Sequence, residues 1–77
     1  MKNWQDHIEV DSDILLGKPI IKGTRIFIEF ILERLADGWT RDQIIENYPS
    51  VKSDDIIAIH AYTYECFKDG LLFLKMN

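Results

Sequence analysis

The chain has 77 residues, 47% of them hydrophobic, and a formal net charge of −4; this size predicts a single domain over residues 1–77. The negative charge argues against a purely electrostatic grip on nucleic acid, and no apolar run approaches the roughly 20 residues of a membrane span. Without a secretory signal, and with Cys66 as its one cysteine, the chain is expected to be cytoplasmic.

Size also predicts a partner. A chain this short buries only roughly 60% of its unfolded surface, which leaves a marginal core. Nine aromatic residues are many for so small an interior. The composition therefore favours a homodimer or a bound partner over a free monomer.

Residues 7–26 are predicted to form a short β ribbon or arm. The stretch 7–11 alternates polar and apolar side chains, as a half-buried strand does. The segments 11–13 and 17–19 are typical of turns. The β-branched pair Ile20-Ile21 is expected to pair with the first strand, over a short length because the preceding proline lacks an N–H donor.

The same region holds the one clearly positive run of the chain. Residues 17–26 carry +3 and the rest of the chain carries −7, so an anionic partner is expected to contact this run. Gly17 and Gly23 do not form a phosphate-binding P-loop, because five residues instead of four separate them and no lysine precedes Thr24. Either the glycines provide turns and the lysines are solvated, or the arm contacts phosphates or an acidic partner.

Residues 27–69 are predicted to form a three-helix core. The first helix, about 27–37, has an apolar stripe at Ile28, Ile31, Leu32 and Leu35 and ends at Gly38. The second, about 41–48, begins with a capping box and ends before a proline.

The third helix is expected to begin at Ser53, whose hydroxyl can cap it, and to stop at Gly70. Asp54 and Asp55 are interpreted as charges that favour a helix start. Apolar residues lie nearly all round this helix, so a second face is expected to contact another chain, together with the apolar tail 70–77. The predicted partner-binding residues are Ile57, Tyr62, Tyr64, Phe67, Leu71, Leu72, Phe73 and Leu74.

The helix pattern favours a mainly α fold, with a three-helix, helix-turn-helix (homeodomain-like) core and a short N-terminal β ribbon. DNA contacts, where they exist, are expected from basic residues in the arm and beside the turn, doubled in a dimer, although the third helix starts with acids. These residues are Lys18, Lys22, Arg25, Arg41 and Lys52.

Catalytic chemistry has little support. His7 and His60 lie far apart in sequence, and no nucleophile has a base at a characteristic spacing. With Cys66 they do not offer the ligand spacing of a zinc site. His60 is expected to be packed or interfacial. No metal, no cofactor and no enzymatic activity are predicted.

Several segments together resemble a known family. They are GKPIIKGTRI at 17–26, LADG at 35–38, IIENYP at 44–49, DDI at 54–56 and AY at 61–62. Over about residues 7–63 the chain resembles the domain-of-unknown-function family 433. The resemblance implies a homeodomain-like helix-turn-helix with a short β element. It also implies an antitoxin of the VapB kind from a bacterial type II toxin–antitoxin pair, encoded beside a PIN-like nuclease toxin.

Three functional hypotheses follow. The first is a non-catalytic, antitoxin-like module that binds a nuclease-type toxin, with operator DNA as a further expected ligand. An acidic protein can neutralise a nuclease by covering its basic cleft. The second is a dimeric DNA-binding regulator, and the third is a structural homodimer without a nucleic-acid ligand.

Overall fold

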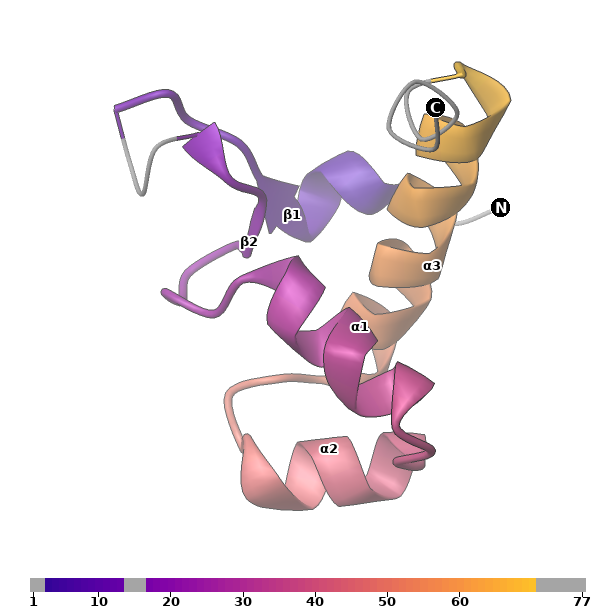
Figure 1. The fold of residues 1–77 in the computed structure, drawn as a ribbon. Helices are drawn as coiled ribbons and strands as arrows, with labels where there is room; N and C mark the ends of the chain where they lie inside the picture. Colours follow the sequence, from indigo (N-terminus) through magenta and orange to yellow (C-terminus); the bar gives the residue numbers. More distant parts are fainter. Residues whose placement is uncertain (1–2, 14–16, 71–77) are drawn as a thin grey trace.

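Three helices and a two-stranded antiparallel sheet form the fold of the computed structural model, which describes residues 3–13 and 17–70 (Figure 1). The mainly helical architecture with a short ribbon confirms the coarse prediction. No helix in the described ranges is long and apolar enough to cross a membrane. The elements are the 3-10 turn η1 (Trp4–Asp6), the strands β1 (Ile8–Glu9) and β2 (Ile20–Ile21), and the helices α1 (Ile28–Ala36), α2 (Arg41–Asn47) and α3 (Ser53–Lys68).

The ribbon is shorter than the sequence predicted. The first strand is limited to Ile8 and Glu9, which pair with β2 in the register Ile8–Ile21 and Glu9–Ile20. The chain then leaves the sheet at the turn predicted at 11–13, where the Asp11 carboxylate accepts a hydrogen bond from the Asp13 N–H at 2.8 Å. This local bond competes with strand pairing, which explains why the alternating pattern of 7–11 overstates the strand.

The first two helices form as predicted, to within one residue at each end. Ile28 and Ile31 on the stripe of α1 are buried, and the glycine after the helix adopts φ +95°. At the start of α2, the Gln43 N–H donates to the Thr40 hydroxyl at 3.1 Å while the Gln43 side chain accepts from the Thr40 N–H at 2.7 Å. This reciprocal capping satisfies two amides that the helix leaves unpaired.

The predicted cap of α3 is wrong. Ser53 is the first helical residue, and Lys52 takes the N-cap position. The Lys52 N–H donates a hydrogen bond to the carboxylate of Asp55, the third residue of the helix, at 2.9 Å. A carboxylate at the third helical position reaches back as the acidic half of a capping box does, so no hydroxyl cap is needed.

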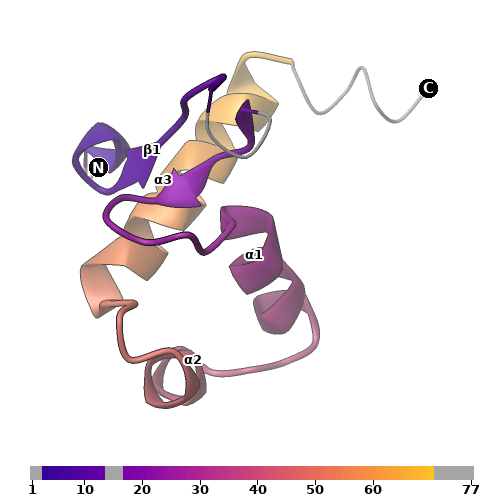
Figure 2. The same ribbon diagram turned by 90° about the vertical axis from the view of Figure 1, so that its left-hand side faces the viewer.

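The N-terminal segment covers part of the second face of α3, whose contact with another chain stays a prediction for the part that is exposed. The Trp4 ring lies edge-on to Tyr62, with ring centroids 4.8 Å apart. Figure 2 shows the N-terminal turn and β1 beside α3. Trp4–Asp6 carries no periodic pattern from which this cover could be predicted.

One core lies where the three helices meet the sheet. Ile31, Ile44 and Ile59 are completely buried, and the aromatic rings of Phe30, Trp39 and Tyr48 close its edge. Isoleucine is the commonest residue type in this core, and the helices and strands each contribute isoleucines to it. The buried core cluster comprises Ile8, Ile21, Ile28, Ile31, Ile44, Val51, Ile56, Ala58 and Ile59.

Candidate functional site

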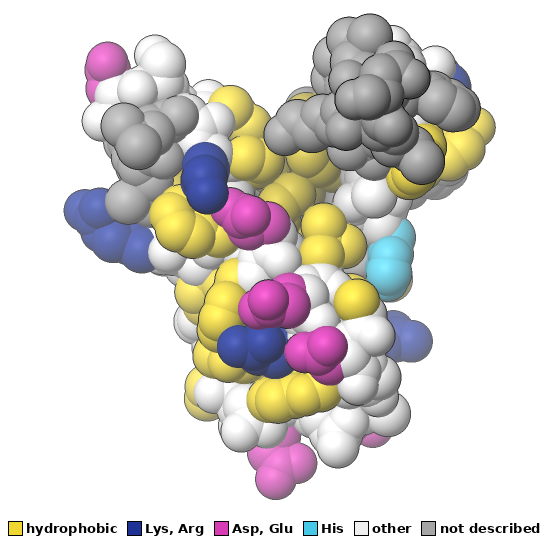
Figure 3. Space-filling model, viewed as in Figure 1, with side chains coloured by type: hydrophobic (Ala, Val, Ile, Leu, Met, Phe, Trp, Pro, Cys, Tyr) yellow, Lys and Arg dark blue, Asp and Glu magenta, His cyan; other side chains and the backbone are white. Residues whose placement is uncertain are grey.

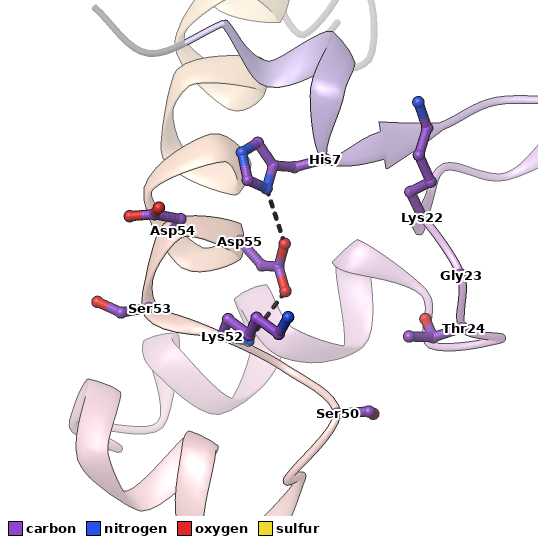
Figure 4. Close-up of a pocket in the computed structure, with 9 residues that line it drawn as sticks. All are labelled: His7, Lys22, Gly23, Thr24, Ser50, Lys52, Ser53, Asp54 and Asp55. Atoms are coloured by element: carbon purple, nitrogen blue, oxygen red, sulfur yellow. Dashed lines mark hydrogen bonds and ion pairs between the residues drawn. The ribbon is translucent and has the colours of Figure 1, made fainter.

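A cleft of about 620 Å³ lies between the turn after β2 and the first turn of α3. The turn is formed by the Thr24 N–H, which donates to the Ile21 carbonyl at 3.0 Å, and by Gly23 at φ +81°. The opposite wall is the start of α3 (Figure 4). The cleft is lined by His7, Lys22, Gly23, Thr24, Ser50, Lys52, Ser53, Asp54 and Asp55.

The floor of the cleft is a hydrogen bond between two side chains of distant segments. His7 Nδ1 lies 2.9 Å from Asp55 Oδ1, and the other oxygen of Asp55 accepts from the Lys52 N–H (Figure 4). The two side chains are 23% and 12% exposed, so water competes little with this bond. One carboxylate oxygen therefore holds the N-terminal segment against α3, and the other caps the start of α3.

Sequence reasoning missed this pair. It treated His7 as isolated and Asp55 as a charge that favours the helix start. The residues are 48 positions apart, and a single histidine in a polar segment carries no local signal for its partner. Only the antiparallel ribbon, which turns the N-terminal segment back across α3, brings them together.

Two of the predicted basic residues meet at the cleft. Lys22 and Lys52 are both exposed, and Lys22 Nζ lies 3.4 Å from the Gln5 carbonyl oxygen. Figure 4 shows the Lys52 side chain extending toward the turn at Gly23, while the side chain of Asp54 points away from the cleft. The cleft therefore presents ammonium groups and hydroxyls, the donors that phosphate oxygens accept from.

Two smaller depressions share lining residues with the cleft. One shares Gly23 and Thr24 and contains Arg25; the other shares Ser53 and contains Arg41, whose guanidinium donates to the Ser53 hydroxyl at 3.0 Å. Four of the five predicted basic residues thus lie along one side of the molecule. The fifth predicted basic residue, Lys18, lines neither the cleft nor these depressions. Its ammonium group pairs with Glu29 at 2.7 Å.

Acidic side chains lie between these basic ones. Glu9 and Asp42 line the two depressions, and Asp54 and Asp55 line the cleft. On the face drawn in Figure 3, acidic and basic side chains likewise lie next to each other. The local charge is balanced, in contrast to the isolated run 17–26 that the sequence displays.

A second surface is apolar and belongs to α3. Ile57, Tyr64 and Phe67 are 40%, 52% and 48% exposed, as the prediction of partner-binding residues requires of an open surface. His60 is exposed in the single chain, so it is not packed in the core, and the interfacial position expected as the alternative stays a prediction. The predicted contacts 71–74 (Leu71, Leu72, Phe73 and Leu74) lie outside the described residues.

Tyr62 does not belong to this open surface. It is half-buried against Trp4, on the side of α3 that faces the N-terminal segment. Burial raises the pKa of its phenol, and the nearby Cys66 thiol raises it further. Tyr62 thus contacts the chain's own N-terminal segment.

Within residues 3–13 and 17–70, no group of three or more His, Cys, Asp or Glu side chains is placed to hold a metal ion. The carboxylates of the cleft are engaged or separated. The described residues provide hydrogen-bond donors at the cleft and apolar area on α3, and both can recognise a ligand or a partner.

Comparison with known proteins gives one family and one fold. A crystal structure at 2.00 Å of a DUF433 member protein from Anabaena variabilis ATCC 29413 superimposes with a TM-score of 0.75 at 22% sequence identity, which shows a shared fold. The alignment covers 84% of this chain and 64% of that one, so the chain spans less than two thirds of the length of the solved relative. No curated protein matches. The family described as "Protein of unknown function (DUF433)" matches residues 8–63, most of the sequence, and the chain therefore belongs to the DUF433 family.

Proposed function

We propose that this protein is a non-catalytic binding module, the antitoxin-like component of a type II toxin–antitoxin pair, which holds a nuclease-type toxin. The observation that carries the proposal is the exposed apolar end of α3. Tyr64 and Phe67 are about half exposed there, and the sequence continues as Leu71-Leu72-Phe73-Leu74. Large apolar and aromatic side chains at a surface mark protein–protein contacts, and such anchors contribute most of the binding energy.

The charge of the chain supports the same proposal. A nuclease needs a basic cleft to hold the phosphates of its substrate, and a chain of net charge −4 complements such a cleft. Complementary charge raises the association rate, whereas apolar anchors slow dissociation. The two features together fit a protein that captures a toxin and keeps it bound.

The test is the mass of the chain mixed with the product of the adjacent gene, measured by light scattering after size exclusion. A stable mixed complex is expected. Leu72→Lys combined with Leu74→Lys should weaken it at least about ten-fold, the effect of losing a binding hot spot. Val10→Lys is the matched control, because Val10 is 53% exposed and lies on the ribbon, away from α3. Absence of a complex would refute toxin binding.

DNA binding is the second candidate, and a specific observation favours it. Lys22, Lys52 and Arg41 lie around the start of α3, which follows α2 after a short turn in the order of a helix-turn-helix. In that motif the N-terminal residues of the second helix reach the bases and the surrounding cations contact phosphates. The homeodomain-like assignment belongs to this candidate.

Salt dependence distinguishes this candidate from the first. Binding to the DNA upstream of the gene should weaken steeply with salt, and Lys22→Ala or Lys52→Ala should each reduce the slope of log K against log salt by about one. Lys18→Ala is the control, since Lys18 is paired with Glu29 away from the cleft. A slope that none of these changes alters would rule out the cleft as a phosphate contact.

A further inference from the structure

The exposed side of α3 carries a heptad-spaced seam. Ile57, His60, Tyr64 and Phe67 follow one another at intervals of three, four and three residues, the a and d spacing of helices that pair side by side. All four are exposed, whereas Ala58 and Ile59 between them are completely buried. The seam spans the eleven residues from Ile57 to Phe67, which places its two ends about 15 Å apart along the helix.

We propose that α3 of a second copy of this chain occupies the seam, running antiparallel. When the two-fold axis crosses the seam midway between His60 and Tyr64, Ile57 faces Phe67 of the partner subunit and His60 faces the partner subunit's Tyr64. By symmetry the same two layers repeat in the other half of the pair. Each of the four seam side chains then has one counterpart of different size, as close packing of two identical helices requires.

Charge complementarity favours this orientation. Asp54 and Lys68 lie at the two ends of α3, one heptad position to the side of the seam. In an antiparallel pair Asp54 lies near Lys68 of the partner subunit, and this happens twice. In a parallel pair the two copies of this flank lie on opposite sides of the seam, so Asp54 would have no such basic counterpart.

The polar residues of the seam favour the same register. His60 and Tyr64 occupy one layer in the antiparallel pair, where a ring nitrogen and a phenol hydroxyl can form a hydrogen bond. A buried polar group costs free energy unless it is bonded, so a layer that pairs the two selects the register. A parallel pair would instead place His60 against the partner's His60.

This inference goes beyond the proposed function, because it concerns the chain alone. An antiparallel pair puts the C-terminal ends of the two α3 helices at opposite ends of the seam. The pair covers Tyr64 and Phe67, which also support the proposed function, so the toxin contact of a dimer would rest on Leu71-Leu72-Phe73-Leu74. One dimer would offer two toxin sites.

Cysteine cross-linking tests the register. In a Cys66→Ser background, chains carrying Ile57→Cys are mixed with chains carrying Phe67→Cys under mild oxidation. The mixed disulfide should form readily, because the two positions share a layer, and each chain alone should stay uncross-linked, because like positions lie about 15 Å apart. Cross-linking of Ile57→Cys with itself, or no excess of the mixed product, would overturn the antiparallel pair.

Sedimentation of the unmodified chain tests the dimer itself. The wild-type chain should show a concentration-dependent dimer, and Ile57→Lys should raise its Kd at least about ten-fold while Val10→Lys leaves it unchanged. Asp54→Lys should weaken the dimer, and adding Lys68→Asp should restore it. A chain that stays monomeric at every concentration would overturn the proposal. Failure of the toxin test leaves these results unaffected.

Discussion

Replacing Asp55 with alanine is expected to lower the free energy of unfolding by about 3 kcal/mol. Its carboxylate accepts from the Lys52 N–H and contacts the His7 ring, both at 2.9 Å, and the residue is 9% exposed. Alanine leaves the Lys52 N–H at the start of α3 without its side-chain acceptor. It also releases the N-terminal segment from α3.

The magnitude follows from the two contacts. Loss of a helix N-terminal cap costs about 1 kcal/mol, and a hydrogen bond to a charged group contributes about 2 kcal/mol. A domain of this size has a total stability on the order of 4–12 kcal/mol, so the loss is a large share of it. Asp55→Asn keeps one oxygen for the Lys52 N–H and is expected to cost about 1 kcal/mol.

Urea unfolding followed by tryptophan fluorescence measures these differences, with an unchanged m-value as the sign that only stability has moved. Asp54→Ala is the matched control: it removes an exposed carboxylate from the same helical turn and should cost at most about 1 kcal/mol. A double-mutant cycle with His7→Ala should give a coupling of at least about 0.5 kcal/mol. If Asp55→Ala costs no more than Asp54→Ala, the reasoning about the buried pair is refuted.

Three further predictions use the same assay. Trp4→Ala should cost about 3 kcal/mol, whereas Trp4→Phe should cost less than half of that, because the buried Trp4 Nε1 has no hydrogen-bond partner among the described residues to lose; equal costs would contradict the packing role. Gly23→Ala should cost about 1 kcal/mol through its φ of +81° alone, since an added Cβ meets nothing within 4 Å, and a neutral result would show that the turn can rearrange. The raised pKa of the Tyr62 phenol favours the protonated form in the folded state, so stability is full below the unfolded pKa of about 10 and falls as the pH rises above it. Tyr62→Phe should make that alkaline decline less steep, and an unchanged decline would assign it to other groups.

The parts of the fold that the sequence predicted are those with local causes. The stripe of α1, the glycine after it and the capping box of α2 each act within one or two helical turns, so their residues determine the ends of the helices directly. The cap of α3 was missed because a carboxylate inside the helix can replace a hydroxyl before it, and both were present in the sequence. The antiparallel ribbon was predicted because one β-branched pair matched one alternating stretch.

The candidate site was predictable only in part. The basic residues were identified from the charge pattern, but their gathering around the start of α3 depends on the fold, which separates Lys18 from the others. The pairing of His7 with Asp55 and the cover that Trp4 gives α3 join segments roughly fifty residues apart. Such contacts depend on the register of the ribbon, and a one-residue slip would remove them.

The two proposed uses of α3 exclude each other, and this makes them easy to separate. Ile57 and His60 lie on the first two turns of α3, where a recognition helix reads DNA and where the proposed dimer seam begins. A second copy seated on the seam covers both residues, so the dimer cannot insert α3 into a groove.

Ile57→Lys therefore acts in opposite directions: it weakens the dimer by burying a charge, and it strengthens contact with phosphates by adding one. The affinities of this variant for itself and for DNA are measured together. If dimer affinity falls while DNA affinity rises, the monomer is the form that binds DNA. A loss of both would mean that the dimer is the form that contacts DNA, through the cations around the cleft instead of through α3.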